Sequence, residues 1–511
     1  MRTFIGLYIL LFIFHVASSQ VDISYLKRQA DLKFKNGEYY EAMPDFEKLA
    51  IENPKNDEFA YKYGVCVAEA GKNKQKALPF LKSSLKGGYS KAAFFVGKIY
   101  FYTMTFDSAH HYLNLYVKQP NLTEKEQSDA QKWLDKLFDA MLLMNDTSKI
   151  IVSNLGSEIN SPFPEYAPVV SSSHDVLYFT SRREGTKGAK KDENGQYYED
   201  IYVSKIVDSI PQMAENSGTD INSKEHDASL ALSADGNTLI FYRTDPYSGA
   251  GDFYFSTKDN EKWSFPIKLG LNINSEHSET SASISADGNT LYFTSDRPGG
   301  YGGLDIYKSQ RGKNGVWGKA QNLGANVNTK YDEESPFISA DEATLYFSSK
   351  GQEVNMGGFD IYASKKTGNG WSKAQNMGYP LNSVVDDLYF STTANGRIAY
   401  FTSNRADSYG DLDIYKAQMP QANVCALMMK GYVRNPANEP VKATIEIIDR
   451  VSSKTLFKTN SESSSGAYTI ILPCKKELKI VFEKGGSSAI EIVEAQETGY
   501  KEVFKIIELN E

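Results

Sequence analysis

Apolar residues between positions 21 and 145 recur three and four residues apart, which is the spacing of one face of a helix. The pattern repeats at about 34 residues, a period typical of stacked helix pairs. Pro54 and Pro120 end two of the predicted helices. Residues 20–146 are therefore predicted to form an array of helical repeats, which either binds a peptide or a neighbouring domain or serves only as a spacer. Equivalent small residues, which allow two helices to approach closely, lie 35 and 32 residues apart at Ala42, Ala77 and Ala109.

Between residues 147 and 420 the pattern changes to short β-branched and aromatic runs, separated by turn residues, in five successive units. Each unit holds four strand-like runs, and pairs such as Asp287-Gly288 supply the positive backbone angles of tight hairpins. Four strands in a repeat of about 50 residues are typical of a β-propeller blade. We predict five blades, or six if one unit has diverged. The units begin at asparagines spaced 62, 52, 54 and 54 residues apart, namely Asn160, Asn222, Asn274, Asn328 and Asn382.

The two ends of this region are predicted to share one blade. The fifth unit stops at Lys416 without an outer strand, whereas residues 148–156, just before the first unit, end in the same Asn-Leu-Gly sequence as residues 322–324. The N-terminal run can therefore supply the missing strand, close the ring and remove exposed strand edges. In the first unit an insertion at residues 184–199 replaces the glycine-rich turn, and we interpret it as a partner-recognition element or a solvated surface loop.

Residues 421–511 are predicted to form a small β-sandwich. Positions 443–449 alternate between apolar and polar residues, as a half-buried strand does, and the runs 489–493 and 503–509 can complete the sheets. Cys425 and Cys474 both lie here, and a disulfide between them is plausible in an oxidising compartment, although the sequence does not define its geometry. Cys66, on a predicted helix, is expected to be a buried small apolar residue.

The first 19 residues have the three parts of a secretory signal peptide. One positive charge at Arg2 precedes an apolar run from Phe4 to Val16, and small residues follow it. We expect cleavage before Gln20; an uncleaved signal anchor is the alternative, although the run is short for a membrane span of about 20 residues. No cysteine lies near this point for lipid attachment, and no later segment is apolar enough to span a bilayer. The mature protein is therefore expected to be soluble and exported.

Composition narrows the class of protein. Of 511 residues, 41% are hydrophobic and 23% are charged, which excludes a disordered or fibrous chain. The formal net charge is −8 and no basic stripe stands out, so nucleic acid is not expected as a partner. Three cysteines cannot form a disulfide framework.

No motif for catalysis or for cofactor binding stands out. The five histidines of the expected mature chain lack zinc-type spacing, and no nucleophile elbow, phosphate loop or dinucleotide fingerprint occurs. His226 and His277 occupy corresponding loops beside Glu225 and Glu276, and we interpret them as surface scaffold. We predict that the chain is not an enzyme and has no cofactor or metal centre; a propeller enzyme of unrecognised type is the least favoured alternative.

One set of acidic residues follows the repeat. Each unit has a carboxylate at the predicted start of its innermost strand, and five such groups around a channel mouth could hold a cation or a basic peptide. The alternative is structural: each carboxylate accepts backbone N–H bonds from a neighbour, and its recurrence in every unit favours this interpretation. The five residues are Glu165, Asp227, Glu279, Glu333 and Asp387.

Three regions resemble known families. The helical repeats are similar to tetratricopeptide repeats, on motifs such as that of residues 36–42 (NGEYYEA). The five units closely resemble the WD40-like repeats called PD40, found in TolB-type propellers, on segments such as residues 285–297 (SADGNTLYFTSDR). The last region resembles the carboxypeptidase regulatory-like domain, a prealbumin-type sandwich, and this resemblance implies no peptidase. The positions that carry it are Gly431, Val433, Pro440, Ala443, Gly466, Tyr468, Leu472 and Pro473.

In the order 1–19, 20–146, 147–420 and 421–511, these parts resemble periplasmic proteins of the Bacteroidetes envelope associated with type IX secretion and gliding. Such proteins typically continue into an OmpA-like domain that binds peptidoglycan; this chain stops where that domain would begin, so peptidoglycan binding is not carried over. The resemblance implies a scaffold or adaptor at the outer membrane that binds other envelope or secretion proteins through its helical array and propeller faces. The alternative is a propeller receptor for a glycan, a peptide or a metal ion.

Overall fold

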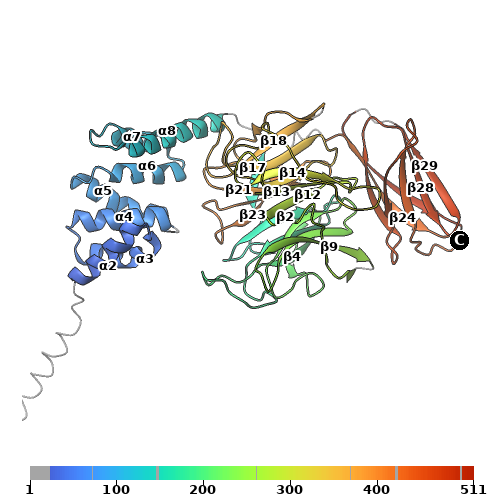
Figure 1. The fold of residues 1–511 in the computed structure, drawn as a ribbon, viewed down its shortest axis with the longest axis horizontal. Helices are drawn as coiled ribbons and strands as arrows, with labels where there is room; N and C mark the ends of the chain where they lie inside the picture. The colour runs from blue at the N-terminus through green and yellow to red at the C-terminus, as the bar shows by residue number, and fades with distance from the viewer. Residues whose placement is uncertain are drawn as a thin grey trace, which may run out of the picture. The chain divides into compact units, whose positions relative to one another are not determined.

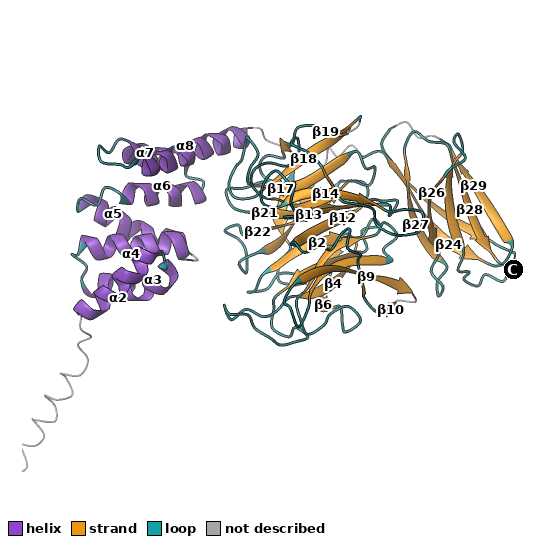
Figure 2. Cartoon of the chain, viewed as in Figure 1, coloured by secondary structure: helices purple, strands orange, loops and turns teal. Residues whose placement is uncertain are grey.

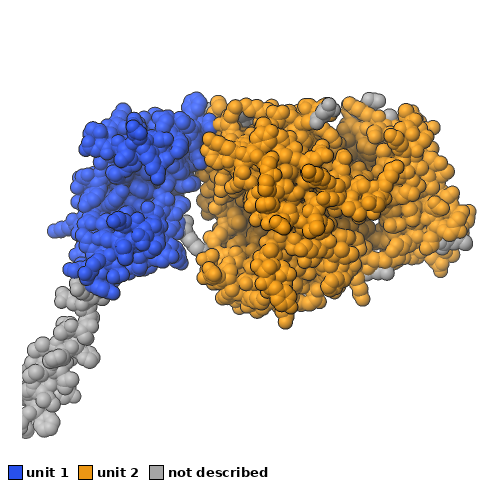
Figure 3. Space-filling model, in the orientation of Figure 1, with its two compact units in different colours: residues 1–141 blue, residues 142–511 orange. Residues whose placement is uncertain are grey.

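The computed structural model describes residues 23–71, 73–145, 149–259, 262–368, 370–419, 424–494 and 498–510. The chain divides into two compact units, residues 1–141 and 142–511 (Figure 3). The predicted signal peptide, residues 1–19, lies outside the described residues. Within the described part of the chain, no helix is both long and apolar enough to cross a membrane.

The first unit is built from helices that pack in chain order, each from α2 to α6 against the next (Figure 1). The last helix, α8, packs through Trp133, whose ring meets that of Phe101 edge to face at 5.3 Å between centroids. The helices are α2 (Ile23–Asn36), α3 (Tyr39–Glu52), α4 (Asp57–Ala70), the short 3-10 helix η1 (Lys74–Ala77), α5 (Leu78–Lys86), α6 (Ala92–Tyr102), α7 (Phe106–Val117) and α8 (Glu124–Asn145).

Small residues set the spacing of these helices, as the sequence predicts. Ala42, Ala77 and Ala109 are fully buried. A side chain at Gly64 would bring its Cβ within 2.6 Å of Leu81 Cγ, so α4 and α5 approach closely only because glycine stands there. Cys66 is a free, buried thiol, which confirms its interpretation as an apolar core residue.

The second unit begins with five antiparallel sheets, which we call blades 1 to 5 (Figure 2). Blade 1 has β2 (Glu165–Val170), β3 (Val176–Ser181), β4 (Asp200–Val207), β5 (Ile210–Pro211) and β6 (Glu215–Asn216). Blade 2 has β7 (Asp227–Leu232), β8 (Thr238–Thr244), β9 (Gly251–Asp259), β10 (Lys262–Trp263) and β11 (Ile267–Lys268). Blade 3 has β12 (Glu279–Ile284), β13 (Thr290–Ser295), β14 (Asp305–Gln310) and β15 (Gln321–Asn322). Blade 4 has β16 (Glu333–Ile338), β17 (Thr344–Ser349), β18 (Asp360–Thr367), β19 (Gly370–Trp371) and β20 (Gln375–Asn376). Blade 5 has β21 (Asp387–Thr392), β22 (Ile398–Ser403), β23 (Asp413–Gln418) and the early strand β1 (Ile151–Asn154).

The blades form a closed ring, so the fold is a β-propeller. The inner strands β2, β7, β12, β16 and β21 each contact the next, and β21 contacts β2. Strand β1 pairs antiparallel with β23, from Ile151 opposite Gln418 to Asn154 opposite Tyr415. This confirms the prediction that the run before the first unit completes the last blade. The ring therefore has no open edge at the point where its two chain ends meet.

The asparagines that mark the repeat fasten each blade to the one before it. Between blades 3 and 4, the side-chain amide of Asn328, in the loop that leads into blade 4, bonds twice to Ile306 on the third strand of blade 3. It accepts from the backbone N–H of Ile306 at 2.8 Å and donates to its carbonyl at 3.0 Å. Each of the other four asparagines makes the same pair of bonds to a buried residue on the third strand of the preceding blade. The regular spacing in the sequence thus reflects one hydrogen-bonded joint per blade.

The C-terminal part of the unit consists of two sheets around one apolar core. The sheets contain the late runs that the sequence assigns to them, as β29 and β30. One sheet has the order β27 (Ala467–Pro473), β24 (Ala426–Arg434) and β30 (Tyr500–Glu508). The other has the order β26 (Thr455–Asn460), β25 (Thr444–Asp449), β28 (Leu478–Lys484) and β29 (Ser487–Val493). A disulfide joins Cys425, just before β24, to Cys474, just after β27.

This sandwich covers one end of the propeller ring. The hairpin turns that follow the inner strands of blades 2 to 5 each present an alanine, and these four pack on Val424, Met428 and neighbouring apolar residues of the sandwich. Polar bonds fix the same contact: the N–H of Cys425 donates to Asp341 at 2.9 Å, and the hydroxyl of Thr459 donates to Asp235 at 2.7 Å. Among the described residues, the sandwich does not pack on the opposite end of the ring, where the inner strands begin. The four alanines are Ala234, Ala286, Ala340 and Ala394.

Candidate binding face of the propeller

The five repeated carboxylates each occupy the first position of an inner strand, and their side chains are buried. In blade 3, the backbone N–H of Ser275 donates to Glu279 at 2.9 Å, and the hydroxyl of the same serine donates at 2.6 Å. A serine or threonine four residues before the carboxylate makes both bonds in every blade. The carboxylates thus cap the loops that lead into the inner strands.

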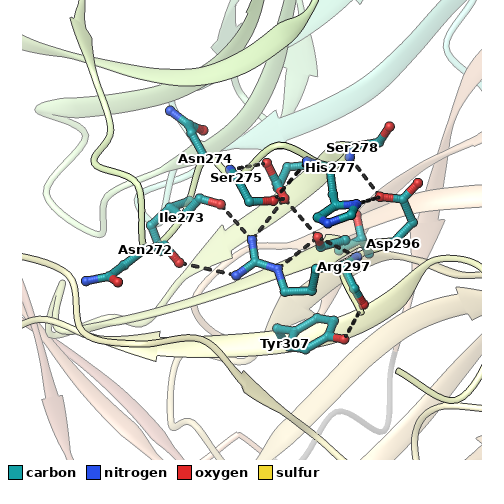
Figure 4. A network of polar contacts seen from close by, with 12 residues as sticks. Asn272, Ile273, Asn274, Ser275, His277, Ser278, Asp296, Arg297 and Tyr307 are labelled. Atoms are coloured by element: carbon teal, nitrogen blue, oxygen red, sulfur yellow. Dashed lines mark hydrogen bonds and ion pairs between the residues drawn. The ribbon is translucent and has the colours of Figure 1, made fainter. Parts of the chain in front are cut away.

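An arginine completes this network in four blades. The guanidinium of Arg297 lies 2.9 Å from Glu279, donates to the carbonyl of Ile273 at 2.7 Å, and lies over the rings of Phe293 and Tyr307 (Figure 4). The equivalent cations of blades 1, 2 and 5 are Arg183, Arg243 and Arg405.

These contacts bear on the hypothesis that the five carboxylates hold a cation or a basic peptide. Each carboxylate is engaged by groups of its own blade, and the described residues contain no cluster of three or more His, Cys, Asp and Glu side chains arranged to hold a metal ion. The cavity between the inner strands is only about 60 Å³, far below the ~300–1,000 Å³ of ligand pockets, and none of the five carboxylates lines it. The geometry therefore favours the structural role over ligand binding for Glu165, Asp227, Glu279, Glu333 and Asp387.

Glu333 differs from the other four. In blade 4 the glycine Gly351 stands in the loop where blade 3 has its arginine, and the described residues place no cation on this carboxylate. The amide of Gln352 instead donates to the carbonyl of Val327 at 2.8 Å, a bond that the arginine makes elsewhere. Burial, with a smaller contribution from the nearby Asp305, raises the pKa of Glu333 to about 7.

We expect the substitution Glu333→Gln to stabilise the protein above neutral pH. Because the folded-state pKa is about 7 and an ordinary glutamate titrates near 4.5, the folded protein loses stability as pH rises from 4.5 through 7. The neutral amide removes this penalty, so the free energy of unfolding should rise by on the order of 1–2 kcal/mol at pH 8 and hardly change at pH 4. Urea denaturation of the original protein and of the Glu333→Gln variant, at pH 4 and at pH 8, measures this difference in the free energy of unfolding.

The matched control is Glu279→Gln, which removes the partner of a buried arginine and should destabilise the protein at both pH values. A loss of stability at pH 8 with Glu333→Gln, comparable to that of the control, would contradict the unpaired-carboxylate interpretation.

The inner strands begin on the side of the propeller that we call the mouth face. It consists of the loops between the second and third strands, residues 182–199, 245–250, 296–304, 350–359 and 404–412, and of the loops that lead into the inner strands, residues 155–164, 217–226, 269–278, 323–332 and 377–386. A cleft of about 830 Å³ opens here over blades 1 to 3. Its lining combines aromatic, acidic and basic side chains, among them Tyr166, Glu199, His226, Tyr242, Asp252, Lys268, Glu276, His277 and Tyr389.

The insertion in blade 1 contributes Glu199 to this cleft, in contact with His226 of the next loop. The phenol of Tyr166 donates to the same carboxylate at 2.8 Å, and the ring of Tyr198 stacks on the imidazole at 3.7 Å between centroids. Burial lowers the pKa of His226 to about 4, helped by the charge of Arg182, so the ring is neutral near pH 7. The side chain of His226 is half-buried and lines the cleft.

The rest of the insertion is held against the propeller. The guanidinium of Arg182 bonds to Asp192 at 2.5 Å, and the ammonium of Lys190 bonds to Glu225 at 2.6 Å. These contacts join the insertion to the loop that leads into blade 2. The insertion is therefore held by ion pairs at several points, and its residue Glu199 lines the mouth cleft. It is not a purely solvated loop.

Exposed tyrosines also lie in the loops of the mouth face. Three lie in equivalent loops of blades 2, 3 and 5, and a fourth precedes the inner strand of blade 4. Their exposed fractions are 97% for Tyr247, 53% for Tyr301, 55% for Tyr409 and 50% for Tyr331. Large, rigid, half-polar rings of this kind are enriched at recognition surfaces, so this face has the chemistry of an interface.

Comparison with known proteins leaves the chain without a family assignment: no protein-family model and no curated protein matches it. Solved structures that resemble it include an alpha-L-arabinofuranosidase from Lactobacillus brevis, 11% identical over 52% of this chain and 91% of that chain, with a TM-score of 0.34. An alpha-L-arabinanase from Penicillium chrysogenum, complexed with arabinobiose, is 10% identical over 53% of this chain and 99% of that chain, with a TM-score of 0.32. At this level of likeness, neither structure assigns a reaction or a ligand to this chain.

The prediction that the chain is not an enzyme is wrong as an exclusion, because solved structures that resemble it include glycoside hydrolases. The prediction rested on missing motifs, and those motifs belong to hydrolases, kinases and zinc enzymes of other folds. Propeller enzymes assemble their sites from residues on separate blades, which short sequence motifs do not reveal.

Proposed function

We propose that this chain is an exported cell-envelope adaptor that binds another envelope protein at the mouth face of its propeller. The observation that carries the proposal is the asymmetry of the ring: the sandwich covers one end, and the other end has a cleft and presents the exposed rings of Tyr247, Tyr301, Tyr331 and Tyr409. The PD40-like repeats, the signal-peptide pattern and the order of the parts support a place in the periplasm, at the outer membrane and in contact with type IX secretion components. The proposal includes a five-bladed ring, a tetratricopeptide-like array as a second platform and a prealbumin-like sandwich.

A receptor for a small ligand is the second candidate, and the mouth cleft favours it. Its volume of about 830 Å³ lies within the range of ligand pockets. Tyrosine rings and convergent carboxylates, such as Tyr166 and Glu199, are groups that stack on and bond to sugars or peptides.

The adaptor proposal is tested by capture of envelope proteins on immobilised protein, with cross-linking and mass spectrometry to identify what is bound at the mouth face. Replacing Tyr247, Tyr301 and Tyr409 together with serine should weaken capture of the partner at least about tenfold, because exposed aromatic residues supply much of the energy of such interfaces. The triple serine variant of Val451, Ile490 and Ile506, exposed on the sandwich, is the matched control and should capture the partner normally.

Equal capture by the two triple variants would contradict the adaptor proposal. Binding of a defined sugar or peptide that Glu199→Gln abolishes, without loss of protein capture by that variant, would instead support the receptor.

A further inference from the structure

We propose that a second site, the basic cleft between blades 3 and 4 and the hairpin of β25 and β26, binds an anionic saccharide. The cleft has a volume of about 1210 Å³, above the ~300–1,000 Å³ of drug-sized pockets, so it has room for a ligand of several sugar units. It lies on the side of the propeller that carries the sandwich and is separate from the mouth face, since the hairpin turns after the inner strands contribute to it.

The charge of this cleft is opposite to that of the chain. The whole protein carries a formal charge of −8, yet the cleft is lined by six cations and only two carboxylates, Asp287 and Glu342. The cations come from both walls: Lys308, Arg311, Lys313 and Lys366 from the blades, and Lys454 and Lys458 from the sandwich.

Four of these six cations, Arg311 among them, pair with no carboxylate of the described residues. Lys366 lies 3.8 Å from Glu342, and Lys458 lies 3.2 Å from Glu446. Among the residues that the structure describes, no carboxylate pairs with Lys308, Lys313 or Lys454. Several positive charges gathered in one concave surface raise the local concentration of anions, because low-dielectric walls focus the field.

The two walls of the cleft are fixed relative to one another. The side-chain amide of Asn289, in a hairpin turn of blade 3, donates to the carbonyl of Leu456 on β26 at 3.1 Å. The guanidinium of Arg311 donates to the carbonyl of Gly315 at 2.9 Å and lies over the ring of Trp317. A cleft with preformed walls binds without the cost of ordering them.

The other side chains of the lining favour a saccharide over a peptide. Asn289, Thr290, Gln310 and Thr455 offer amide and hydroxyl groups, and the two carboxylates can accept from ligand hydroxyls. A peptide needs apolar anchors or a free strand edge; Tyr292 and Trp371 are buried, and Asn289 already bonds to the outer edge of β26 at Leu456. Lysines, as point charges on flexible stems, suit carboxylate or phosphate groups spread along a chain of sugars.

The experiment is calorimetric titration of the full mature chain with a galacturonic acid hexamer, with a neutral galactose hexamer, with a glutamate decapeptide and with inorganic phosphate. We expect binding of the acidic hexamer that weakens as NaCl is added, and no binding of the neutral hexamer. The double variant Lys313→Glu with Lys454→Glu changes one residue of each wall. It should weaken binding of the acidic hexamer about tenfold or more.

The matched control is Lys205→Glu with Lys501→Glu, two exposed lysines outside the cleft, which make the same change in net charge. Equal weakening by both double variants would overturn the proposal, because it would show only long-range attraction. Preferential binding of the glutamate decapeptide would assign the cleft to an acidic peptide, and binding of inorganic phosphate alone would show a simple anion site. Either result would overturn the saccharide proposal. It would also be overturned if no probe bound.

Discussion

Replacing Arg297 with methionine is expected to lower the free energy of unfolding by about 3–5 kcal/mol, the largest loss of any single change considered for this protein. Glu279 is 1% exposed, so its charge would be left buried without a cation. The carbonyl of Ile273 would also lose its donor. In other blades, burial raises the pKa of Glu165, Asp227 and Asp387 as well, and there the paired arginine opposes it. Glu333, which has no arginine, has its pKa raised to about 7.

Urea denaturation of the variant at neutral pH measures this loss. The matched control is Arg450→Met, since Arg450 pairs with Glu477 at the surface, where both side chains are about half exposed, and it should cost less than about 1 kcal/mol. Adding Glu279→Gln to Arg297→Met should recover part of the stability, because it removes the buried charge. No recovery in the double variant would show that packing of the guanidinium between Phe293 and Tyr307, rather than its charge, accounts for the effect.

The substitution Asn328→Leu is expected to cost about 2–4 kcal/mol, because it leaves the N–H of Ile306 buried without a partner and leaves its carbonyl with Leu323 N–H as donor in place of two donors. Leucine has the same branched arrangement of heavy atoms and is no smaller, so the substitution removes hydrogen bonds without leaving a cavity. The joint between blades 3 and 4 should open locally, and hydrogen exchange at the Ile306 amide should become faster by two orders of magnitude or more, as about 3 kcal/mol implies.

Asn314→Leu is the matched control, since Asn314 bonds only to the backbone of its own exposed turn and should cost little. If exchange at Ile306 is unchanged in Asn328→Leu while stability falls, the asparagine does not act as the fastening between the blades.

The propeller could be predicted from sequence because its information is local and repeated. Hairpin turns such as Asp287-Gly288-Asn289 specify neighbouring strands, and Gly288 adopts the positive φ of +72° that the turn requires. The closing strand was predictable because residues 154–156 repeat the Asn-Leu-Gly of residues 322–324.

The role of the asparagines was not predictable in the same way. Asn328 bonds to a residue 22 positions earlier, on another blade, and nothing in its neighbourhood indicates that partner. The capping of each carboxylate by a hydroxyl four residues before it is local, so the pattern of Ser275 and Glu279 was a usable signal for burial.

Both candidate binding sites escaped prediction because their residues come from separate segments. Glu199 and Tyr166 are 33 residues apart and meet only after blade 1 has folded. The basic cleft joins Lys313 to Lys454 across two sheet systems, so no basic stripe is visible along the chain. The docking of the sandwich on four turn alanines was equally hidden, since alanine in a turn carries no chemistry of its own.

Strand β1 is the first strand of the propeller to be synthesised, but its partner β23 is the last. Asn154 and Asp413, which bond at 2.7 Å in the closing blade, are separated by 259 residues of chain. Because the chain is synthesised from its N-terminus, β1 is made early and remains unpaired until β23 has followed it. In the chain, β1 follows the helical unit. A force that pulls on that unit therefore acts on the hydrogen bonds between β1 and β23, which close the ring.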